Sequence, residues 1–275
     1  MHSTKRVDSS VLHRFYRLNG WLKFEFDDSL KSWVNASLQS ARDAVHRPDN
    51  QHWWRYQGTW FVGVNSLDND RFGKVQGGIH LQGKAAEFLS NNLGVDLSRL
   101  DQAQVSVCLP GYPKSSNTES RAANSYRLNK DAAHLDGVLK QAATAERYVQ
   151  EPHDYILAIP MSDFSSDAAP FVVWEGSHNI VRSTFKQFFE NSASENWSQV
   201  AITSCYQQVR RQIFSECERK QLIMKPGEAF LVHRLMLHGT GPWKTNARCG
   251  PDGRMICFFR PSSLSIEEWL DSSLY

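Results

Sequence analysis

The sequence predicts a mainly β protein, a double-sheet jelly roll with flanking helices. Three observations predict this fold. Short runs rich in Val, Ile, Phe and Leu fill the second half of the chain, and Pro, Gly, Asp and Ser bound them as they bound strands. The connections between these runs are long and irregular, whereas a parallel sheet alternates strand and helix regularly. Amphipathic helical patterns gather in the first hundred residues and in one later segment.

The N-terminal part, residues 1–100, is expected to be mainly helical. From Asp28 to Val45 apolar residues recur at i, i+3, i+4 and i+8, which indicates an amphipathic helix with one face on a core. A shorter helix is predicted over 11–18. The segment GKAAEFLSNNLG predicts a third helix that ends at Gly94, because glycine accepts the left-handed conformation that closes helices.

The jelly-roll core is expected over residues 101–261. Its strands are the apolar runs QVSVCLP, DYILAIPMSD, APFVVWEGSH, QLIMKPGEAFLVH and RMICFFRP. A helical insertion is expected over about 182–220, where helical spacing continues with few breakers. The tail, residues 262–275, is expected to form a C-terminal helix, since Ser265 and Glu268 have the spacing of a capping box.

Composition and charge argue against several classes of protein. Apolar residues make up 41% and charged residues 22%, which is ordinary globular usage, so we expect a single domain over 1–275 and no disorder. A net charge of +2 without a dense Lys/Arg run argues against nucleic-acid binding. The chain has neither the apolar core of a signal peptide nor a run of about 18 apolar residues that could enter a membrane. The five cysteines are scattered without a CxxC pair, and we expect reduced thiols in a cytoplasmic protein.

The stretch DAAHLDGVL places His134 and Asp136 two residues apart. On an extended backbone two such side chains point to the same side and can bind one ion. Alone, this pair is a common accident, but His238 ends an apolar strand beside two glycines, where a ligand has room to approach. Two histidines and one carboxylate on one face of a metal are the ligands of non-haem iron sites. His134, Asp136 and His238 are therefore the candidate metal ligands.

Arg254 opens the apolar strand that follows His238 in the chain. Its guanidinium can point into the same barrel and bind a carboxylate through two parallel hydrogen bonds. Arg248, in the loop before this strand, is the competing candidate, and Arg260 is a weaker third. We favour Arg254 because its place at the start of a strand fixes the direction of its side chain.

Four stretches of the chain, AHLDG, PFVVWEGSHN, GEAFLVHRLMLHGTGPW and GRMICFFRP, resemble in order and spacing the motifs of the phytanoyl-CoA dioxygenase family of Fe(II)- and 2-oxoglutarate-dependent oxygenases. The opening FYRLNGWLKFEFDDSLKSWVNASL also resembles the start of that family, so the resemblance covers nearly the whole chain. It implies a double-stranded β-helix, or cupin-like, core. It also implies that His134, Asp136 and His238 are the catalytic iron ligands and that Arg254 anchors 2-oxoglutarate. The loop KTNARCGPDG departs from the family by being longer than its usual connection.

The activity implied by the resemblance is that of an oxidoreductase, a non-haem iron dioxygenase. Such enzymes use Fe(II), the co-substrate 2-oxoglutarate and O2 to hydroxylate or otherwise oxidise a small-molecule substrate, with succinate and CO2 as co-products. Related halogenases replace the carboxylate ligand with a small residue, so Asp136 favours hydroxylation or another oxidation over halogenation. The alternatives are a cupin-like module that binds a metal or carboxylate without turnover, and a metal-dependent enzyme without 2-oxoglutarate. A shared fold does not transfer a substrate.

Other polar and aromatic residues have more ordinary interpretations. We expect His178, in WEGSHN, to be a structural turn residue, and His233 to be a core histidine or one that orients a metal ligand. The aromatic stretch HWWRYQGTWF is expected to pack the N-terminal helices on the barrel, with a wall of the substrate pocket as the alternative. Three residues just ahead of the His134 motif can contact a co-substrate or substrate, but none is assigned a role: Tyr112, Asn129 and Lys130.

Overall fold

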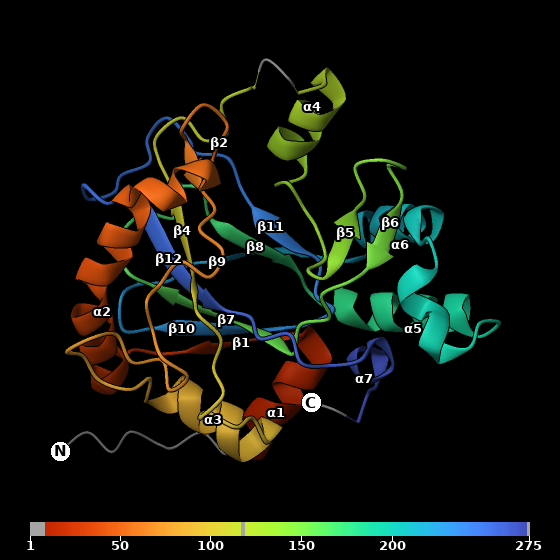
Figure 1. Ribbon diagram of the computed structural model, residues 1–275, viewed down its shortest axis with the longest axis horizontal. Helices are drawn as coiled ribbons and strands as arrows, with labels where there is room; N and C mark the ends of the chain where they lie inside the picture. The colour runs from red at the N-terminus through yellow and green to blue at the C-terminus, as the bar shows by residue number, and fades with distance from the viewer. Residues whose placement is uncertain (1–8, 117–118, 274–275) are drawn as a thin grey trace.

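The computed structural model describes residues 9–116 and 119–273, and two antiparallel sheets form its core (Figure 1). The larger sheet contains β1 (Trp21–Phe24), β2 (Trp54–Arg55), β3 (Trp60–Phe61), β4 (Gln104–Cys108), β7 (Tyr155–Pro160), β10 (Ala229–His233) and β12 (Arg254–Phe259). The smaller sheet contains β8 (Phe171–Trp174), β9 (Arg219–Leu222) and β11 (His238–Thr240), and β5 (Val138–Lys140) and β6 (Arg147–Val149) form a separate hairpin. The strand orders are β1-β10-β7-β12-β4-β3-β2 and β11-β8-β9. The prediction of a mainly β jelly roll with flanking helices is confirmed.

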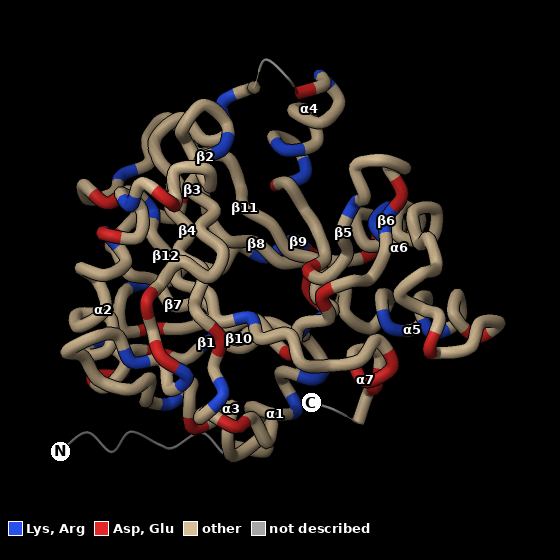
Figure 2. The backbone as a smooth tube through the Cα atoms, viewed as in Figure 1, with Lys and Arg blue, Asp and Glu red and all other residues tan. Residues whose placement is uncertain are grey.

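Seven α-helices accompany the sheets in the part of the chain that the structure describes. They are α1 (Ser9–Asn19), α2 (Asp28–His46), α3 (Lys84–Leu93), α4 (Arg121–Asn129), α5 (Ser177–Phe189), α6 (Thr203–Glu216) and α7 (Ile266–Leu270), with short 3-10 helices at Pro48–Trp53 and Ser194–Gln199. The first three pack against the larger sheet, and α5 and α6 pack against the smaller one (Figure 1). In the part of the chain that the structure describes, no helix has the length and apolar character needed to cross a membrane. Positive and negative residues are interspersed along the chain (Figure 2).

Helix α2 illustrates how the sequence sets the fold. The Asp27 carboxylate caps its N-terminus by accepting the backbone N–H groups of Ser29 and Leu30 at 2.8 and 3.2 Å. The apolar stripe predicted from the sequence is the buried face, on which Trp33 is fully buried, and the Trp33 indole N–H donates to the Gly73 carbonyl at 2.7 Å. Helix α2 is thus fixed at its start by a cap and along its length by packing.

The N-terminal part contributes more strand than its sequence pattern predicted. β1 pairs with β10 at one edge of the larger sheet, while β2 and β3 extend the opposite edge beyond β4. The stretch AFLVHRLMLHGT also differs from the single strand expected for it, because His233 ends β10 in the larger sheet and His238 begins β11 in the smaller one. The chain thus changes sheet between these two histidines. Trp174 lies on the outer layer of the smaller sheet, where its ring contacts Phe214 of α6.

A pair of buried histidines lies where α1, α5 and β10 of the larger sheet meet. His178, in the first turn of α5, and His233 are each 1% exposed, and their ring centroids lie 4.6 Å apart. The Nε2 atom of His178 lies 3.0 Å from the Arg17 carbonyl, and the Nε2 atom of His233 lies 3.0 Å from the Arg182 guanidinium. Burial lowers the pKa of His178 to about 4, and burial with the neighbouring His178 and arginine charges holds the pKa of His233 well below its usual value.

We expect this histidine pair to make the fold sensitive to acid. Between pH 6.5 and about 4 the unfolded imidazoles take up protons and the native ones stay neutral, so the unfolded state binds more protons and stability falls as the pH decreases. The pKa change of His178 corresponds to about 3 kcal/mol over that range. Urea unfolding at a series of pH values gives the free energy of unfolding as a function of pH. Over this pH range its slope should be smaller by about 1.4 kcal/mol per pH unit in His178→Gln than in the wild-type protein. The exposed His52→Gln is the control, and an equal slope in wild type and His178→Gln would contradict the prediction.

Candidate metal centre

A backbone bridge brings two of the predicted ligands together. The His134 N–H donates to the His238 carbonyl at 2.8 Å, and the His238 N–H donates to the His134 carbonyl at 3.1 Å. Residues paired directly across an antiparallel bridge have their side chains on the same face. The two imidazoles therefore face the same space, with ring centroids 4.5 Å apart, although the residues are far apart in the sequence.

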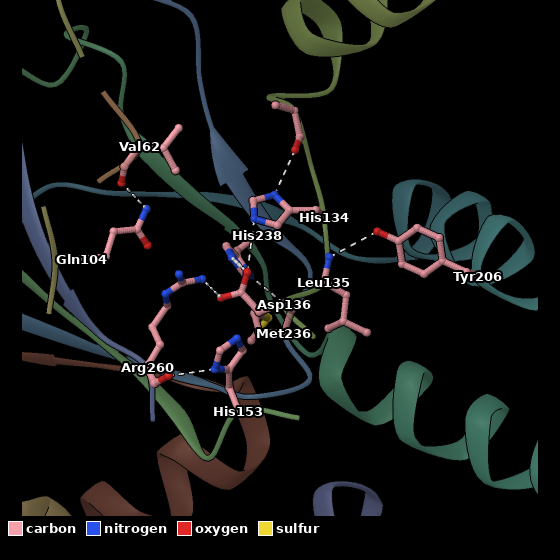
Figure 3. A network of polar contacts seen from close by, with 11 residues as sticks. Val62, Gln104, His134, Leu135, Asp136, His153, Tyr206, Met236, His238 and Arg260 are labelled. Atoms are coloured by element: carbon pink, nitrogen blue, oxygen red, sulfur yellow. Dashed lines mark hydrogen bonds and ion pairs between the residues drawn. The ribbon is translucent and has the colours of Figure 1, made fainter. Parts of the chain in front are cut away.

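Asp136 completes a cluster of three potential ligands (Figure 3). Its Oδ1 atom lies 3.3 Å from the Nε2 atom of His134 and 3.5 Å from the Nε2 atom of His238. One ligand atom from each of the three residues falls within 4.8 Å of the other two. The side chains of Asp136 and His238 are 6% exposed while that of His134 is 49% exposed, so the cluster is buried on one side and open on the other.

The hydrogen bonds of the two imidazoles favour metal binding through Nε2. The Nδ1 atom of His134 lies 3.1 Å from the Ala132 carbonyl, and the Nδ1 atom of His238 lies 2.9 Å from the Met236 carbonyl. A carbonyl only accepts, so the tautomer with its proton on Nδ1 makes both of these hydrogen bonds and leaves the Nε2 lone pair free for a metal. Burial lowers the pKa of His238, which also favours the neutral ring that coordinates metals.

Arg260 holds the other oxygen of the carboxylate. Its guanidinium donates to the Oδ2 atom of Asp136 at 2.8 Å, which leaves Oδ1 directed at the histidines (Figure 3). Burial alone would raise the pKa of the Asp136 carboxyl, but the charge of Arg260, with the contacts to the two histidines, holds it well below its usual value. The backbone of Arg260 is itself fixed, because its carbonyl lies 2.7 Å from Nδ1 of His153 and its N–H donates to Asp101 at 3.0 Å.

A strained turn delivers the chain to His134. Asp131 and Ala132 both have φ of +51°, a conformation that costs energy for residues with a Cβ atom. The Asp131 carboxylate binds the Arg219 guanidinium through two bonds of 2.7 and 2.8 Å, which offsets that cost. A Cβ atom at Gly239 would lie 2.2 Å from the Asp131 carbonyl oxygen. The sequence context of Gly239 suggested room for a ligand. In the structure Gly239 makes room for this turn instead.

Arg254 lies at the start of β12 and is fully buried. Its Nε donates to the Ala169 carbonyl at 2.8 Å, and its terminal nitrogens reach the hydroxyls of Ser106 at 3.5 Å and Thr240 at 3.4 Å. All three partners are neutral, and no carboxylate pairs with Arg254 within the described ranges. A buried cation without a counter-ion is costly, which makes this guanidinium suited to an anionic ligand. The competitor Arg248 lies exposed in its loop.

The residues just ahead of the His134 motif have different environments. The Tyr112 side chain is buried, and its hydroxyl has no hydrogen-bond partner among the residues described here. Its ring contacts Trp60, whose indole N–H donates to the same Ser106 hydroxyl that Arg254 reaches. Lys130 lies over the ring of Phe214, and Asn129 bonds to Ser125. Among these three, Tyr112 is the one near the arginine.

Arg260 was predicted only as a weak candidate for binding 2-oxoglutarate. Its contact with Asp136 was not predicted. A signal was present, because residues on a strand alternate in direction and Arg260 follows Arg254 by an even number of positions. No sequence signal marks the pairing of Asp131 with Arg219.

A cavity of about 470 Å³ lies over the outer side of the smaller sheet, lined partly by Trp174 and Phe214.

The donor set of the cluster fits a divalent iron. Two neutral imidazole nitrogens and one carboxylate oxygen on one side of a site are the ligands of non-haem Fe(II), with the remaining positions open. The hydrogen bonds to Nδ1 and to the second carboxylate oxygen are the contacts that orient such ligands. The residues present therefore fit the ion that the sequence resemblance implies.

No protein-family model and no curated protein sequence matches the chain. The chain is similar in structure to AviO1 from Streptomyces viridochromogenes Tue57, with 10% identity over 95% of this chain and 98% of that chain and a TM-score of 0.51. The fold is shared. EctD from S. alaskensis, solved with 2-oxoglutarate and 5-hydroxyectoine, matches at 12% identity over 96% of this chain and 79% of that chain, with a TM-score of 0.49.

A further match is SnoK, described as a non-heme alpha ketoglutarate dependent carbocyclase from nogalamycin biosynthesis. It has 9% identity over 93% of this chain and 85% of that chain, with a TM-score of 0.49. At these identities the comparison with AviO1 shows a common fold, and none of the three identifies a reaction or a substrate for this chain.

Proposed function

We propose that the chain is an Fe(II)- and 2-oxoglutarate-dependent dioxygenase that hydroxylates or otherwise oxidises a small molecule, in the manner of the phytanoyl-CoA dioxygenase family. One observation carries the proposal. The cluster of His134, Asp136 and His238 shares β11 with a contact of a buried arginine, because the guanidinium of Arg254 reaches Thr240, two residues beyond His238. Among the residues that the structure describes, Arg254 has no carboxylate partner. A metal site and an anion site in one barrel are what this co-substrate requires.

The residues of the cluster and their neighbours would have the following roles. His134, Asp136 and His238 would hold the iron, and Arg260 would keep one oxygen of Asp136 directed at it. When bound, Fe(II) together with 2-oxoglutarate and O2 supplies the oxidation of the substrate, with succinate and CO2 as co-products. The exposed side of the cluster, at His134, would admit the substrate.

Arg254 would bind the distal carboxylate of 2-oxoglutarate. Its two terminal nitrogens make only long contacts of 3.5 and 3.4 Å to hydroxyl groups, so they can turn to a carboxylate at little cost. The burial of the guanidinium strengthens that ion pair, because a low dielectric screens it poorly. The presence of a carboxylate ligand at Asp136 favours hydroxylation over halogenation.

Succinate release tests the proposal. Purified protein loaded anaerobically with Fe(II) and given 2-oxoglutarate, O2 and a panel of small molecules should release succinate only when all three cofactors are present. The His134→Ala variant should release none. Protein that binds the metal and 2-oxoglutarate without releasing succinate over the panel would indicate the cupin-like binding module. Protein that binds the metal and not 2-oxoglutarate would indicate a different metal-dependent enzyme.

A further inference from the structure

Two tyrosines outside the barrel hold the backbone around His134. The Leu135 N–H donates to the Tyr206 hydroxyl at 3.2 Å (Figure 3). The Tyr126 hydroxyl donates to the Ala133 carbonyl at 2.7 Å. The peptides on both sides of His134 therefore have their hydrogen bonds made by side chains from other elements, α6 for the first contact and α4 for the second.

Tyr206 is held in a stack of cations and aromatic rings. It is 2% exposed, and the Cζ atoms of Arg210 and Arg147 lie 4.6 and 5.2 Å from its ring centroid. Arg210 also donates to the Tyr126 hydroxyl at 2.9 Å and lies over the ring of Tyr126 at 5.0 Å. Cation–π contacts and linked hydrogen bonds of this kind fix the position of both hydroxyl groups. The helical insertion thereby presents a rigid acceptor to the Leu135 N–H.

The direction of this hydrogen bond lets it control the orientation of the metal ligands. Along an extended backbone successive N–H groups point to opposite sides. The His134 N–H is taken by the bridge to His238, so the Leu135 N–H points away from β11 and towards Tyr206. Leu135 joins His134 to Asp136, so a rotation of its peptide moves both ligand side chains together.

We propose that Tyr206 is a positioning residue for the metal centre, which acts through the Leu135 peptide and makes no contact with the ion. The inference rests on the proposed function only in requiring a metal at the His134, Asp136 and His238 cluster. Tyr126 acts in the same direction through the Ala133 carbonyl. Groups that hydrogen-bond directly to metal ligands typically change metal affinity by about 10- to 100-fold when they are removed, and because Tyr206 acts through a neighbouring peptide we expect an effect at the low end of that range.

The Tyr206→Phe variant tests the inference, because it keeps the ring and its contacts with the two arginines and removes only the hydroxyl. We expect its dissociation constant for Co(II), used as the probe ion, to rise about 10-fold. The visible absorption of bound Co(II) should also change, since looser ligands alter the coordination geometry. Tyr126→Phe should shift both measurements in the same direction.

Ser162→Ala is the matched control. Ser162 is buried and its hydroxyl accepts the Met255 N–H at 2.9 Å, so the variant also removes a buried side-chain bond to a backbone N–H. The peptide it holds carries no metal ligand, and Ser162 lies outside the stack of arginines and tyrosines around Tyr206. We expect the thermal stability of the metal-free protein to fall in both Ser162→Ala and Tyr206→Phe, and Co(II) affinity to fall only in the latter.

Unchanged Co(II) affinity in Tyr206→Phe, or an equal loss in Ser162→Ala, would overturn the inference. His134→Ala shows whether wild-type binding occurs at the cluster, and wild-type protein that binds no Co(II) there would overturn both the inference and the proposed function. Wild-type protein that binds Co(II) at the cluster but releases no succinate contradicts the proposed function alone. The two failures are therefore distinguishable.

Discussion

An Asp136→Ala variant is expected to lose metal binding and to be about 3–5 kcal/mol less stable than the wild-type protein. Metal binding is lost because Asp136 supplies the one carboxylate of the cluster. Stability falls because the guanidinium of Arg260, whose side chain is 17% exposed, is left without its carboxylate partner. Titration with Co(II) measures the first effect, and urea unfolding of the metal-free protein measures the second.

A second substitution separates the two effects. In the double variant Asp136→Ala/Arg260→Met the unpaired Arg260 guanidinium is removed as well. An apolar side chain of similar length takes its place. We expect the double variant to recover most of the lost stability while its metal binding stays absent. Wild-type Co(II) affinity in Asp136→Ala would show that the cluster is not the metal site. A double variant as unstable as the single one would show that Arg260 does not cause the loss.

An Arg254→Met variant is expected to lose 2-oxoglutarate binding without losing stability. Removing one partner of a buried charge pair costs about 2 kcal/mol or more, which corresponds to a loss of affinity of at least about 30-fold. The metal-free and co-substrate-free fold gains instead, because a buried cation with neutral partners is replaced by an apolar side chain. Calorimetric titration of Co(II)-loaded protein with 2-oxoglutarate measures the affinity, and thermal unfolding measures the stability.

Arg248→Met is the control for this prediction. Arg248 was the competing candidate in the sequence, and it lies exposed in the loop before β12. Its replacement should leave the affinity for 2-oxoglutarate unchanged. The reverse result, with affinity lost in Arg248→Met and kept in Arg254→Met, would place the anion site in the loop.

The fold was predictable where burial leaves a periodic trace in the sequence. Helix α2 has a stripe of apolar residues because one of its faces packs on the sheet, and β12 is apolar from Met255 to its end because both of its faces are covered. Helix α4 was not predicted, and the structure gives the reason, since none of its residues is buried and no apolar stripe forms. The short hairpin of β5 and β6 was missed for a similar reason, because β5 buries only Val138.

The change of sheet between β10 and β11 was hidden by an apolar turn. Leu235, Met236 and Leu237 are fully buried, so their composition resembles a strand. The buried Arg234 in this turn donates to the carbonyls of Trp269 at 2.8 Å and Asp271 at 2.7 Å, at the end of the chain. These bonds give the buried Arg234 guanidinium acceptors from a distant segment, and no local sequence pattern can indicate such a contact.

The candidate site divides in the same way. The spacing of His134 and Asp136 is a local feature, and it follows from the alternation of side chains on an extended backbone. The partners that hold them are distant in sequence, because Arg260 lies 124 residues from Asp136 and Tyr206 lies 71 residues from Leu135. The residues that chelate could therefore be proposed from one sequence, whereas those that orient them required the fold.

The backbone bridge between His134 and His238 also couples metal binding to the local unfolding of this part of the chain. It closes a loop of about a hundred residues, and the entropy gained by opening such a loop opposes the bridge. An ion held by both histidines adds its binding free energy to the cost of that opening. The amides of His134 and His238, which donate across the bridge, are therefore expected to exchange their hydrogens with solvent more slowly in the metal-loaded protein, and to slow together.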